Sequence, residues 1–411
     1  MTIYNPEKTY INKNCFTNVK TITSINCSTT PWENNDMSHG FDGCNLLRTI
    51  TSISPSITNV VYAFNGCSNL ITSVQIPSGI TDITNTFAFC SSLSTAPVIP
   101  NTVTNMSNAF SNCSVLATVG AIPNSVIDMH RAFQACDSLV DAPDMSNAIA
   151  ITNMHYAFYH CDALKNAPNL YNCTNITNLH ETFSYCPSLE NVPPLPSTIQ
   201  QMYKAFWGCT NLSNIPAIPS SVTNIDSAFA YCTSMTDAPT IPDSVNSSLS
   251  DTFTGCNNLR NVPNLGNHIT GLVNTFLRCN NLTTVPNIPA TVTNMYATFS
   301  DCTSLTGAIF IQAKEITNAV NCFANTSAVK SVYIPFAYQN GIPTNTYNSF
   351  LAAGYSESGT QHGVYLKDID SRSTRLDVTD YEYTVDGDSV FLNTYTGSDI
   401  DIVTPKIEVI V

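Results

Sequence analysis

The sequence predicts an α/β repeat solenoid, a right-handed stack of units of about 23 residues with a parallel sheet along one face. The pattern Phe-x-x-Cys-x-x-Leu recurs twelve times, with Met235 as the one substitute for Leu. Its copies lie 23 residues apart, except for one step of 24 and two of 25. Such a fixed period is the signature of stacked, similar units. The Phe residues of the pattern are Phe41, Phe64, Phe87, Phe110, Phe133, Phe158, Phe183, Phe206, Phe229, Phe253, Phe276 and Phe299.

The first part of each unit has the spacing of one helical face. Apolar residues stand at offsets 0, 3, 4 and 7, as in Met106, Ala109, Phe110 and Cys113. In eleven of twelve units the residue before the Met place is Asn, Asp, Ser or Gly, types that favour helix N-caps. We therefore expect each unit to begin with one or two capped helical turns.

The second part of the unit predicts a short strand. Proline pairs such as Pro97 and Pro100 stop any helix and leave an extended segment between the Leu and the second Pro. Stacked segments of this kind would form the parallel sheet, with the helical turns on the opposite face. At roughly 4.8 Å per strand, twelve units would give an array of about 55 to 60 Å.

The ends of the chain depart from the period. Residues 1–36 are expected to cap the first unit, and residues 37–335 to hold twelve to thirteen units, the last one worn because Thr326 replaces its Cys. Residues 336–370 form a predicted C-terminal cap or connector. Residues 371–411 predict a β-hairpin around Asp386-Gly387 and a final apolar strand, 407–411. An unpaired strand of this kind is expected to join another copy of the chain or an anchoring protein.

Composition excludes several functions. The chain has 411 residues, 15 basic and 29 acidic, and a formal charge of −14, so it should repel nucleic acid and anionic membranes. No run of about 18 apolar residues predicts a membrane span. Residues 1–10 show no secretory signal. Only 11% of residues are charged, and a surface of Asn, Ser and Thr suits an extracellular or virion-exposed protein.

Twelve of the sixteen cysteines stand in the repeat column, and no Cys-x-x-Cys predicts a zinc site. Neighbours in the column would lie near 5 Å apart, within disulfide range. We favour a ladder of buried free thiols that behave as small apolar residues. A bridge between Cys15 and Cys27 stays open as an alternative, and Cys173 and Cys322 fall outside the column.

Residues 130–231 place large side chains where other units have Ser, Asn, Thr, Ala or Asp. Clustered aromatics of this kind predict a contact surface; the alternative is that the two 25-residue units bulge and the aromatics cover them. A metal site on His130, His155 and His180 is disfavoured because Glu181 is in no ligand motif, and no cofactor is expected. We call the following residues the aromatic–histidine patch: His130, Arg131, His155, Tyr156, Tyr159, His160, His180, Tyr185, Tyr203, Lys204, Trp207 and Tyr231.

A second polar column competes with the patch as the binding face. The strand-side positions carry Asn166, Asn191, Asn214, Asp237 and Asn261. Their structural interpretation is a ladder of amide hydrogen bonds that satisfies turn backbone.

Segments such as AFAYCTSMTDAPTIPDSV and TFSDCTSL resemble the BspA-like leucine-rich repeats, with their AFxxCxxL...IPxSVT pattern, over about residues 37–335. The Met four residues before the Phe is closer to the related FxxCxxL...TNMxxMF surface-protein repeats. The resemblance implies a leucine-rich-repeat-like solenoid of the kind found on surface proteins of bacteria and some protists, used in adhesion, and on phage particles. It implies no catalytic site.

The sequence carries no enzyme motif. It has no Gly-rich phosphate loop, Gly-x-Ser-x-Gly, His-Glu-x-x-His or calcium loop. We therefore expect a binding or adhesion protein that recognises a protein or glycan at a cell or virion surface. The alternative is a phage structural or tail-associated receptor-binding protein, which mass spectrometry of purified phage particles would distinguish.

Overall fold

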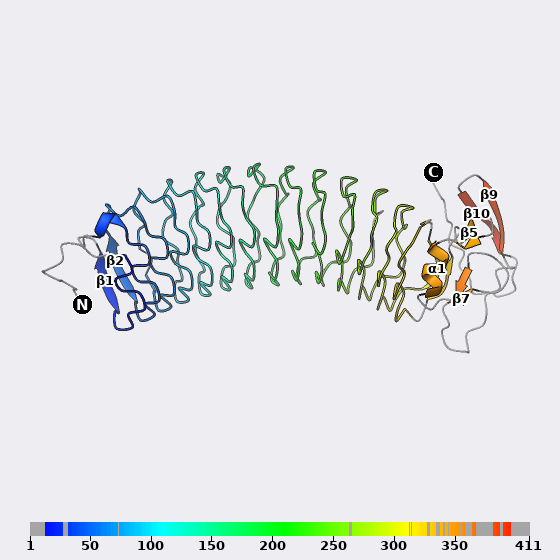
Figure 1. Ribbon diagram of the computed structural model, residues 1–411, viewed down its shortest axis with the longest axis horizontal. Helices are drawn as coiled ribbons and strands as arrows, with labels where there is room; N and C mark the ends of the chain where they lie inside the picture. Colours follow the sequence, from blue (N-terminus) through cyan, green and yellow to red (C-terminus); the bar gives the residue numbers. More distant parts are fainter. Residues whose placement is uncertain are drawn as a thin grey trace.

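The computed structural model shows a long, gently curved stack of turns (Figure 1). It describes residues 13–27, 32–72, 74–262, 265–311, 313, 315–326, 329–333, 338–339, 342–343, 345–352, 356–357, 364–366, 381–386 and 389–395. The predicted final strand, 407–411, lies outside these residues.

Regular elements gather at the two ends of the stack (Figure 1). At the first end β1 (Ser24–Cys27) pairs in parallel with β2 (Thr49–Ile53), and η1 (Glu33–Asn35) lies between them in sequence. At the other end a four-stranded sheet has the order β3 (Gly307–Phe310), β4 (Val329–Tyr333), β8 (Val364–Leu366) and β7 (Ser356–Glu357).

Two antiparallel pairs of strands and one α-helix follow the stack. β5 (Tyr338–Gln339) pairs antiparallel with β6 (Ile342–Pro343), and β9 (Tyr381–Asp386) pairs antiparallel with β10 (Ser389–Tyr395). The single α-helix of the described residues, α1, spans Asn345–Ala352. No helix in the described part of the chain is long and apolar enough to cross a bilayer.

One column of phenylalanine rings forms the centre of the core. Successive rings from Phe16 to Phe323 lie 5.3 to 5.9 Å apart, centroid to centroid, and are tilted by at most 19°. The twelve Phe residues of the repeat are fully buried. The aligned column confirms that identical positions stack on one another.

The cysteine column lies beside the rings. Each of the twelve repeat cysteines is buried and donates its thiol to the carbonyl oxygen of the Phe one turn earlier, at 2.9 to 3.3 Å. These twelve are free thiols, as predicted, and Cys15 and Cys27 are not bonded to each other. The thiols therefore act as small core side chains that also satisfy a buried carbonyl.

The predicted helical turns are wrong. Counting the Met place as position 0, the amides of positions 0, 2, 4 and 6 donate to the next unit, as Met106, Asn108, Phe110 and Asn112 do at 2.7 to 2.9 Å. The amides of positions 3, 5 and 7 donate to the carbonyl three residues back. No helix occurs among the described residues 36–326. Each unit is instead a run of tight turns with every second amide turned sideways.

Left-handed residues explain why no helix forms. Positions 2 and 6 have positive φ in every unit, for example Asn108 (55°) and Asn112 (60°). A left-handed residue ends an α-helix, and two of them four residues apart produce successive turns. Such turns also place apolar residues at offsets 0, 3, 4 and 7, so the spacing that predicted a helix fits them equally well.

The predicted caps act on turns rather than on helices. The side-chain oxygen of Asn105 accepts the amide of Ser107 at 3.0 Å, and Asp128 accepts that of His130 at 2.8 Å. Eight further units do the same with Asp or Asn at this place. These are Asx-turns, in which the side chain binds the amide two residues on.

The predicted continuous sheet is reduced to isolated parallel bridges in the middle of the stack, as between Asn166 and Asn191. Eight middle units carry a proline at position 14, for instance Pro143 and Pro193, and proline has no amide to donate to a neighbouring strand. The same segment lacks proline in β1, β2, β3 and β4, where parallel strands do form.

Degenerate units, which lack part of the repeat motif, continue the stack at both ends. Within the segment predicted as a cap, Asn14 and Asn18 have positive φ and Phe16 stacks on Phe41 at 5.3 Å, so residues 13–27 already have the backbone of a unit. At the other end Thr326 stands in the cysteine place and donates to the carbonyl of Phe323 at 2.6 Å. The ring column therefore extends one unit beyond the twelve-fold motif in each direction.

Candidate binding surface

The patch residues occupy positions 1, 2, 5 and 6 of successive units. Positions 0, 3, 4 and 7 are buried, so the intervening side chains are the ones that reach the surface. Most patch residues are half-buried, whereas Arg131 and Tyr231 are exposed. The structure thus brings all twelve predicted residues onto one strip that runs along the stack.

Tyr156 is the centre of the first half of the patch. The Arg131 guanidinium lies over its ring at 4.9 Å from the centroid. Its hydroxyl donates to Glu181 Oε1 at 3.3 Å and lies 3.2 Å from His180 Nε2. The Tyr159 ring meets it edge to face at 5.6 Å. Groups from three successive units therefore hold this one ring.

Stacked rings form the second half of the patch. His160 and Tyr185 lie face to face at 4.5 Å and 11°, and the Tyr185 and Trp207 rings are 4.9 Å apart. The Lys204 ammonium lies 4.2 Å from the centre of the Trp207 ring. Gly208 makes room for Tyr185, because a Cβ there would lie 3.2 Å from the ring. Each of these rings therefore packs against a ring of the neighbouring unit.

The histidine column runs along one edge of the patch. The His155 and His180 rings are 5.5 Å apart, and His180 lies 4.9 Å from the Tyr203 ring. Burial, together with Arg131, lowers the pKa of His130 below its ordinary value. Burial, then His180 and His130, lowers the pKa of His155. No three His, Cys, Asp or Glu groups of the described residues are placed to hold a metal ion.

Acid should destabilise this column. Because the folded pKa values of His130 and His155 are lowered, the unfolded chain binds protons first as the pH falls below about 6.5. The contribution of these two histidines to stability is therefore fully present above that pH and is lost below it. Arg131 and His180 repel the new charges, and Asp128 offsets this repulsion only in part. We expect the double variant His130→Gln, His155→Gln to lose less thermal stability than the unaltered chain between pH 7.5 and pH 5. Equal losses, measured by circular dichroism, would contradict this assignment.

The two 25-residue units do not bulge in the patch. Their extra residues form an added turn at 145–151 and at 170–176, where Ala148 and Cys173 are buried. The lateral bonds of the patch segments keep their usual pattern, as in Arg131 N to His155 O (3.0 Å) and Tyr156 N to His180 O (3.2 Å). The aromatics therefore do not cover a local distortion, and the added turn explains the extra cysteine.

Between residues 131 and 231, seven large residues stand where the backbone is left-handed; in other units His39, Tyr62, Phe89 and Arg278 do so. At positions 2 and 6 many other units carry Gly or Asn, such as Gly66 and Asn108, which tolerate positive φ. A bulky residue there costs of order 1 kcal/mol or more. The seven are Arg131, Tyr156, His160, Glu181, Tyr185, Lys204 and Tyr231, with φ between 48° and 62°. The patch is therefore strained as well as aromatic.

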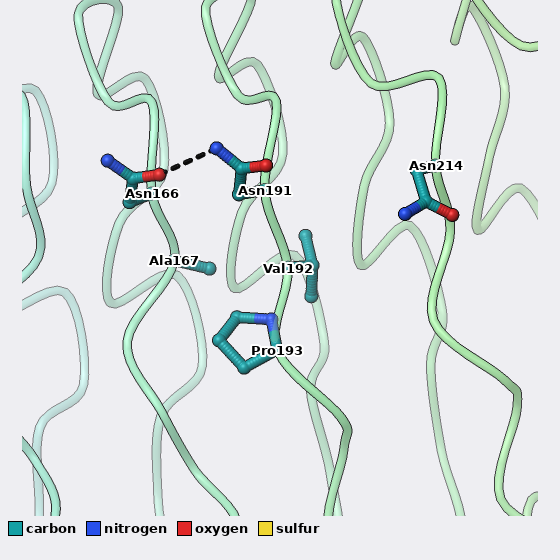
Figure 2. A pocket seen from close by; sticks show the side chains of 6 residues that line it. All are labelled: Asn166, Ala167, Asn191, Val192, Pro193 and Asn214. Carbon is teal, nitrogen blue, oxygen red and sulfur yellow. Dashed lines mark hydrogen bonds between the residues drawn. The ribbon is translucent and has the colours of Figure 1, made fainter.

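The competing Asn column is a ladder of side-chain bonds, but an interrupted one. Asn166 donates to Asp141 at 2.6 Å, Asn191 donates to Asn166 at 2.8 Å, and Asn261 donates to Asp237 at 2.6 Å. Asn214 stands apart from Asn191, and a shallow hollow of about 240 Å³ lies between them, beside Pro193 (Figure 2). The hydrogen bonds of the Asn column join side chains to one another rather than to turn backbone.

The sequence signature described as "BspA type Leucine rich repeat region" matches residues 9–140, 121–236, 149–283 and 226–350. These matches cover most of the chain. The chain belongs to the BspA-type leucine-rich repeat family. No curated protein matches its sequence.

Two solved structures of leucine-rich repeat proteins are similar to this chain. A leucine-rich repeat protein from Bacteroides ovatus is 23% identical, with a TM-score of 0.54, and the match covers 72% of this chain and 78% of that one. A leucine rich cell surface protein from Faecalibacterium prausnitzii is 24% identical, with a TM-score of 0.42, and the match covers 72% of this chain and 81% of that one. The first establishes that this BspA-type chain has a leucine-rich repeat fold.

One carboxylate beside the aromatic–histidine patch was underestimated from sequence. Glu181 appeared only as a carboxylate without a metal motif, yet it accepts the Tyr156 hydroxyl and lies 3.7 Å from His180 Nε2. Lys204, a predicted patch residue, packs on the faces of Trp207 and Tyr203. Their shared positions in the repeat were the available signal, since Arg131, Tyr156, Glu181 and Lys204 all stand at position 2.

Proposed function

We propose that this BspA-type chain is a non-enzymatic binding protein that recognises a protein or glycan partner at a surface through the aromatic–histidine patch. The observation that carries the proposal is the set of large side chains at left-handed positions. Backbone strain persists where function requires it, and six of the twelve patch residues stand at left-handed positions, as does Glu181 beside them. Large residues at such positions are fewer outside the patch, where they are His39, Tyr62, Phe89 and Arg278.

The geometry suits recognition. The rings of Tyr156, Tyr185 and Trp207 are held by their neighbours before any partner arrives, so little side-chain entropy is lost on binding. Tyr, Trp and Arg are the residue types that supply most binding energy in interfaces. Family membership and the cell surface protein of similar sequence support a place on the outside of a cell or particle.

The proposal is tested with a triple variant, Tyr156→Ala, His180→Ala, Trp207→Ala. Beads coated with the chain would be applied to a panel of host and bacterial cells, and retention under flow would be measured. We expect the triple variant to lose retention by at least about tenfold, since hot-spot aromatics cost about 2 kcal/mol or more each when truncated. Protease or glycosidase treatment of the cells then tells a protein partner from a glycan.

A matched control comes from the same places in other units. Tyr62 stands at position 2 like Tyr156, Tyr296 at position 1 like His180, and Leu277 at position 5 like Trp207. The variant Tyr62→Ala, Tyr296→Ala, Leu277→Ala should keep full retention. If both triple variants retain binding, or both lose it equally, the patch is not the contact surface.

A further inference from the structure

We propose that the patch binds an acidic, extended segment of a partner protein, whose carboxylates reach Arg131 and Lys204. This inference rests on the proposed function and names the chemistry of the partner. Its basis is the state of the two cations, the occupation of the ring faces and the charge of the rest of the chain.

The two cations of the patch have no carboxylate partner. Among the described residues, the ion pairs of Lys and Arg are Lys13 with Asp36 and Arg278 with Asp301, each at 3.9 Å. Arg131 and Lys204 are in none. On a chain with 29 acidic and 15 basic residues, these two cations balance Glu181 and Asp226 of the same strip, so the strip is less negative than the chain as a whole.

The carboxylates nearest the patch are already engaged. Glu181 is 12% exposed at its side chain, accepts the Tyr156 hydroxyl and faces His180. Asp128 Oδ1 accepts the amide of His130 at 2.8 Å, and Asp162 lies 3.9 Å from His160 Nδ1. Asp226, at position 1 of the unit next to Lys204, accepts the amide of Ser250 at 2.9 Å. These carboxylates meet hydroxyl, amide and imidazole groups, and leave the guanidinium and the ammonium for a partner.

Packing on rings prepares both cations for carboxylates. The Arg131 guanidinium lies over the Tyr156 ring, and a stacked guanidinium keeps its in-plane N–H groups available for a bidentate carboxylate. Lys204 lies between the rings of Trp207 and Tyr203, at 4.2 and 5.2 Å. Both side chains are thereby positioned without being neutralised, and a charge-assisted bond to either is stronger than a neutral one.

The ring faces argue for a protein rather than a sugar. A pyranose ring would stack on an open aromatic face, but Arg131 and Lys204 cover faces of Tyr156 and Trp207, while His160 and Tyr185 cover one another. The edge of an aromatic ring carries partial positive charge. Ring edges, imidazoles and the two cations all attract the oxygen atoms of an acidic peptide.

The spacing fits an extended segment along the stack. Arg131 and Lys204 are three turns apart, and the Phe rings beneath them rise 5.5 to 5.6 Å per turn. An extended strand covers the resulting distance of about 17 Å in about five residues, at roughly 3.3 Å each. The net charge of −14 repels the same segment elsewhere on the chain, which would confine it to the patch.

Fluorescence anisotropy on the full chain tests the inference. One labelled twelve-residue peptide alternates Glu with Ser around a central Tyr, a second replaces every Glu by Gln, and the third probe is an oligogalacturonate. We expect the Glu peptide to bind at least about tenfold more tightly than the Gln peptide at low salt, and to weaken as salt is raised. The variant Arg131→Gln, Lys204→Gln should weaken Glu-peptide binding by about tenfold or more.

A charge-matched control uses cations outside the patch. Lys165 and Arg260 are exposed at position 11, so Lys165→Gln, Arg260→Gln changes the net charge equally and should leave peptide binding within about twofold of the starting chain, apart from general repulsion. Equal affinity for the Glu and Gln peptides would overturn the inference, as would tighter binding of the oligogalacturonate. If the aromatic triple variant loses cell retention while the Arg131 and Lys204 variant keeps it, the proposed function stands and this inference fails.

Discussion

Replacing Phe110 by alanine is expected to lower the free energy of unfolding by about 3 to 5 kcal/mol. The ring is fully buried and stacks on Phe87 at 5.6 Å and on Phe133 at 5.7 Å, so its removal opens a cavity between two turns. In a solenoid each unit contacts only its neighbours, and the gap cannot be filled from elsewhere. Urea unfolding followed by circular dichroism measures the loss.

Phe89 supplies the control for this variant. It belongs to the adjacent unit, lies outside the ring column and is 53% exposed. Phe89→Ala should therefore change the free energy of unfolding by no more than about 0.5 kcal/mol. Similar losses for the two variants would mean that the phenylalanine column does not carry the core.

The twelve column cysteines should resist thiol reagents for as long as the chain is folded. All are buried and donate to a carbonyl oxygen, whereas Cys15 is exposed. Burial raises the pKa of Cys113, Cys209 and Cys256 to about 12. The thiolate is the reactive form, and at pH 8 only about one in 10⁴ of these three thiols would be ionised.

Titration with a chromogenic disulfide reagent measures this protection. The folded chain should release about one equivalent rapidly, from Cys15, and the remaining thiols should follow only in denaturant. Raising the pH from 7 to 9 should leave the column cysteines of the folded chain unreactive. Several rapid equivalents from the folded chain, or a total well below sixteen after denaturation without reductant, would show that the column is open or oxidised.

The columns of the fold were predictable from the sequence, and the turns between them were not. Phe, Cys and Leu recur at fixed places because each must meet its counterpart in the next turn. This constraint appears in the sequence as a repeat of nearly constant length. The offsets 0, 3, 4 and 7 are shared by a helix and by successive turns, so periodicity could not separate them. The distinguishing signal was the residue type at positions 2 and 6, where Gly43, Gly66, Asn108 and Asn112 tolerate positive φ.

The prolines of the repeat explain part of the difference between the predicted and the observed strands. The prolines at position 14, such as Pro143 and Pro193, lie inside the segment that the sequence predicts to be extended. They remove the amide that a ladder needs, and in the described residues the parallel strands β1, β2, β3 and β4, which lack such prolines, lie at the ends of the stack.

The patch was predictable as a set of residues but not as a network. Its members depart from the small polar residues of other units, which the sequence shows plainly. The contacts among Tyr156, His180 and Glu181 depend on how neighbouring turns align, and that alignment follows from the lateral backbone bonds. The strain at Tyr156 and Tyr185 could be seen only once the backbone was known.

A crystal structure phased on the native sulfur atoms would test the stacking of the units most directly. The account predicts one cysteine sulfur per turn from Cys44 to Cys302, in a single row beside phenylalanine rings that rise 5.4 to 5.9 Å per turn. Sulfur positions gathered in pairs, or divided among separate cores, would contradict it.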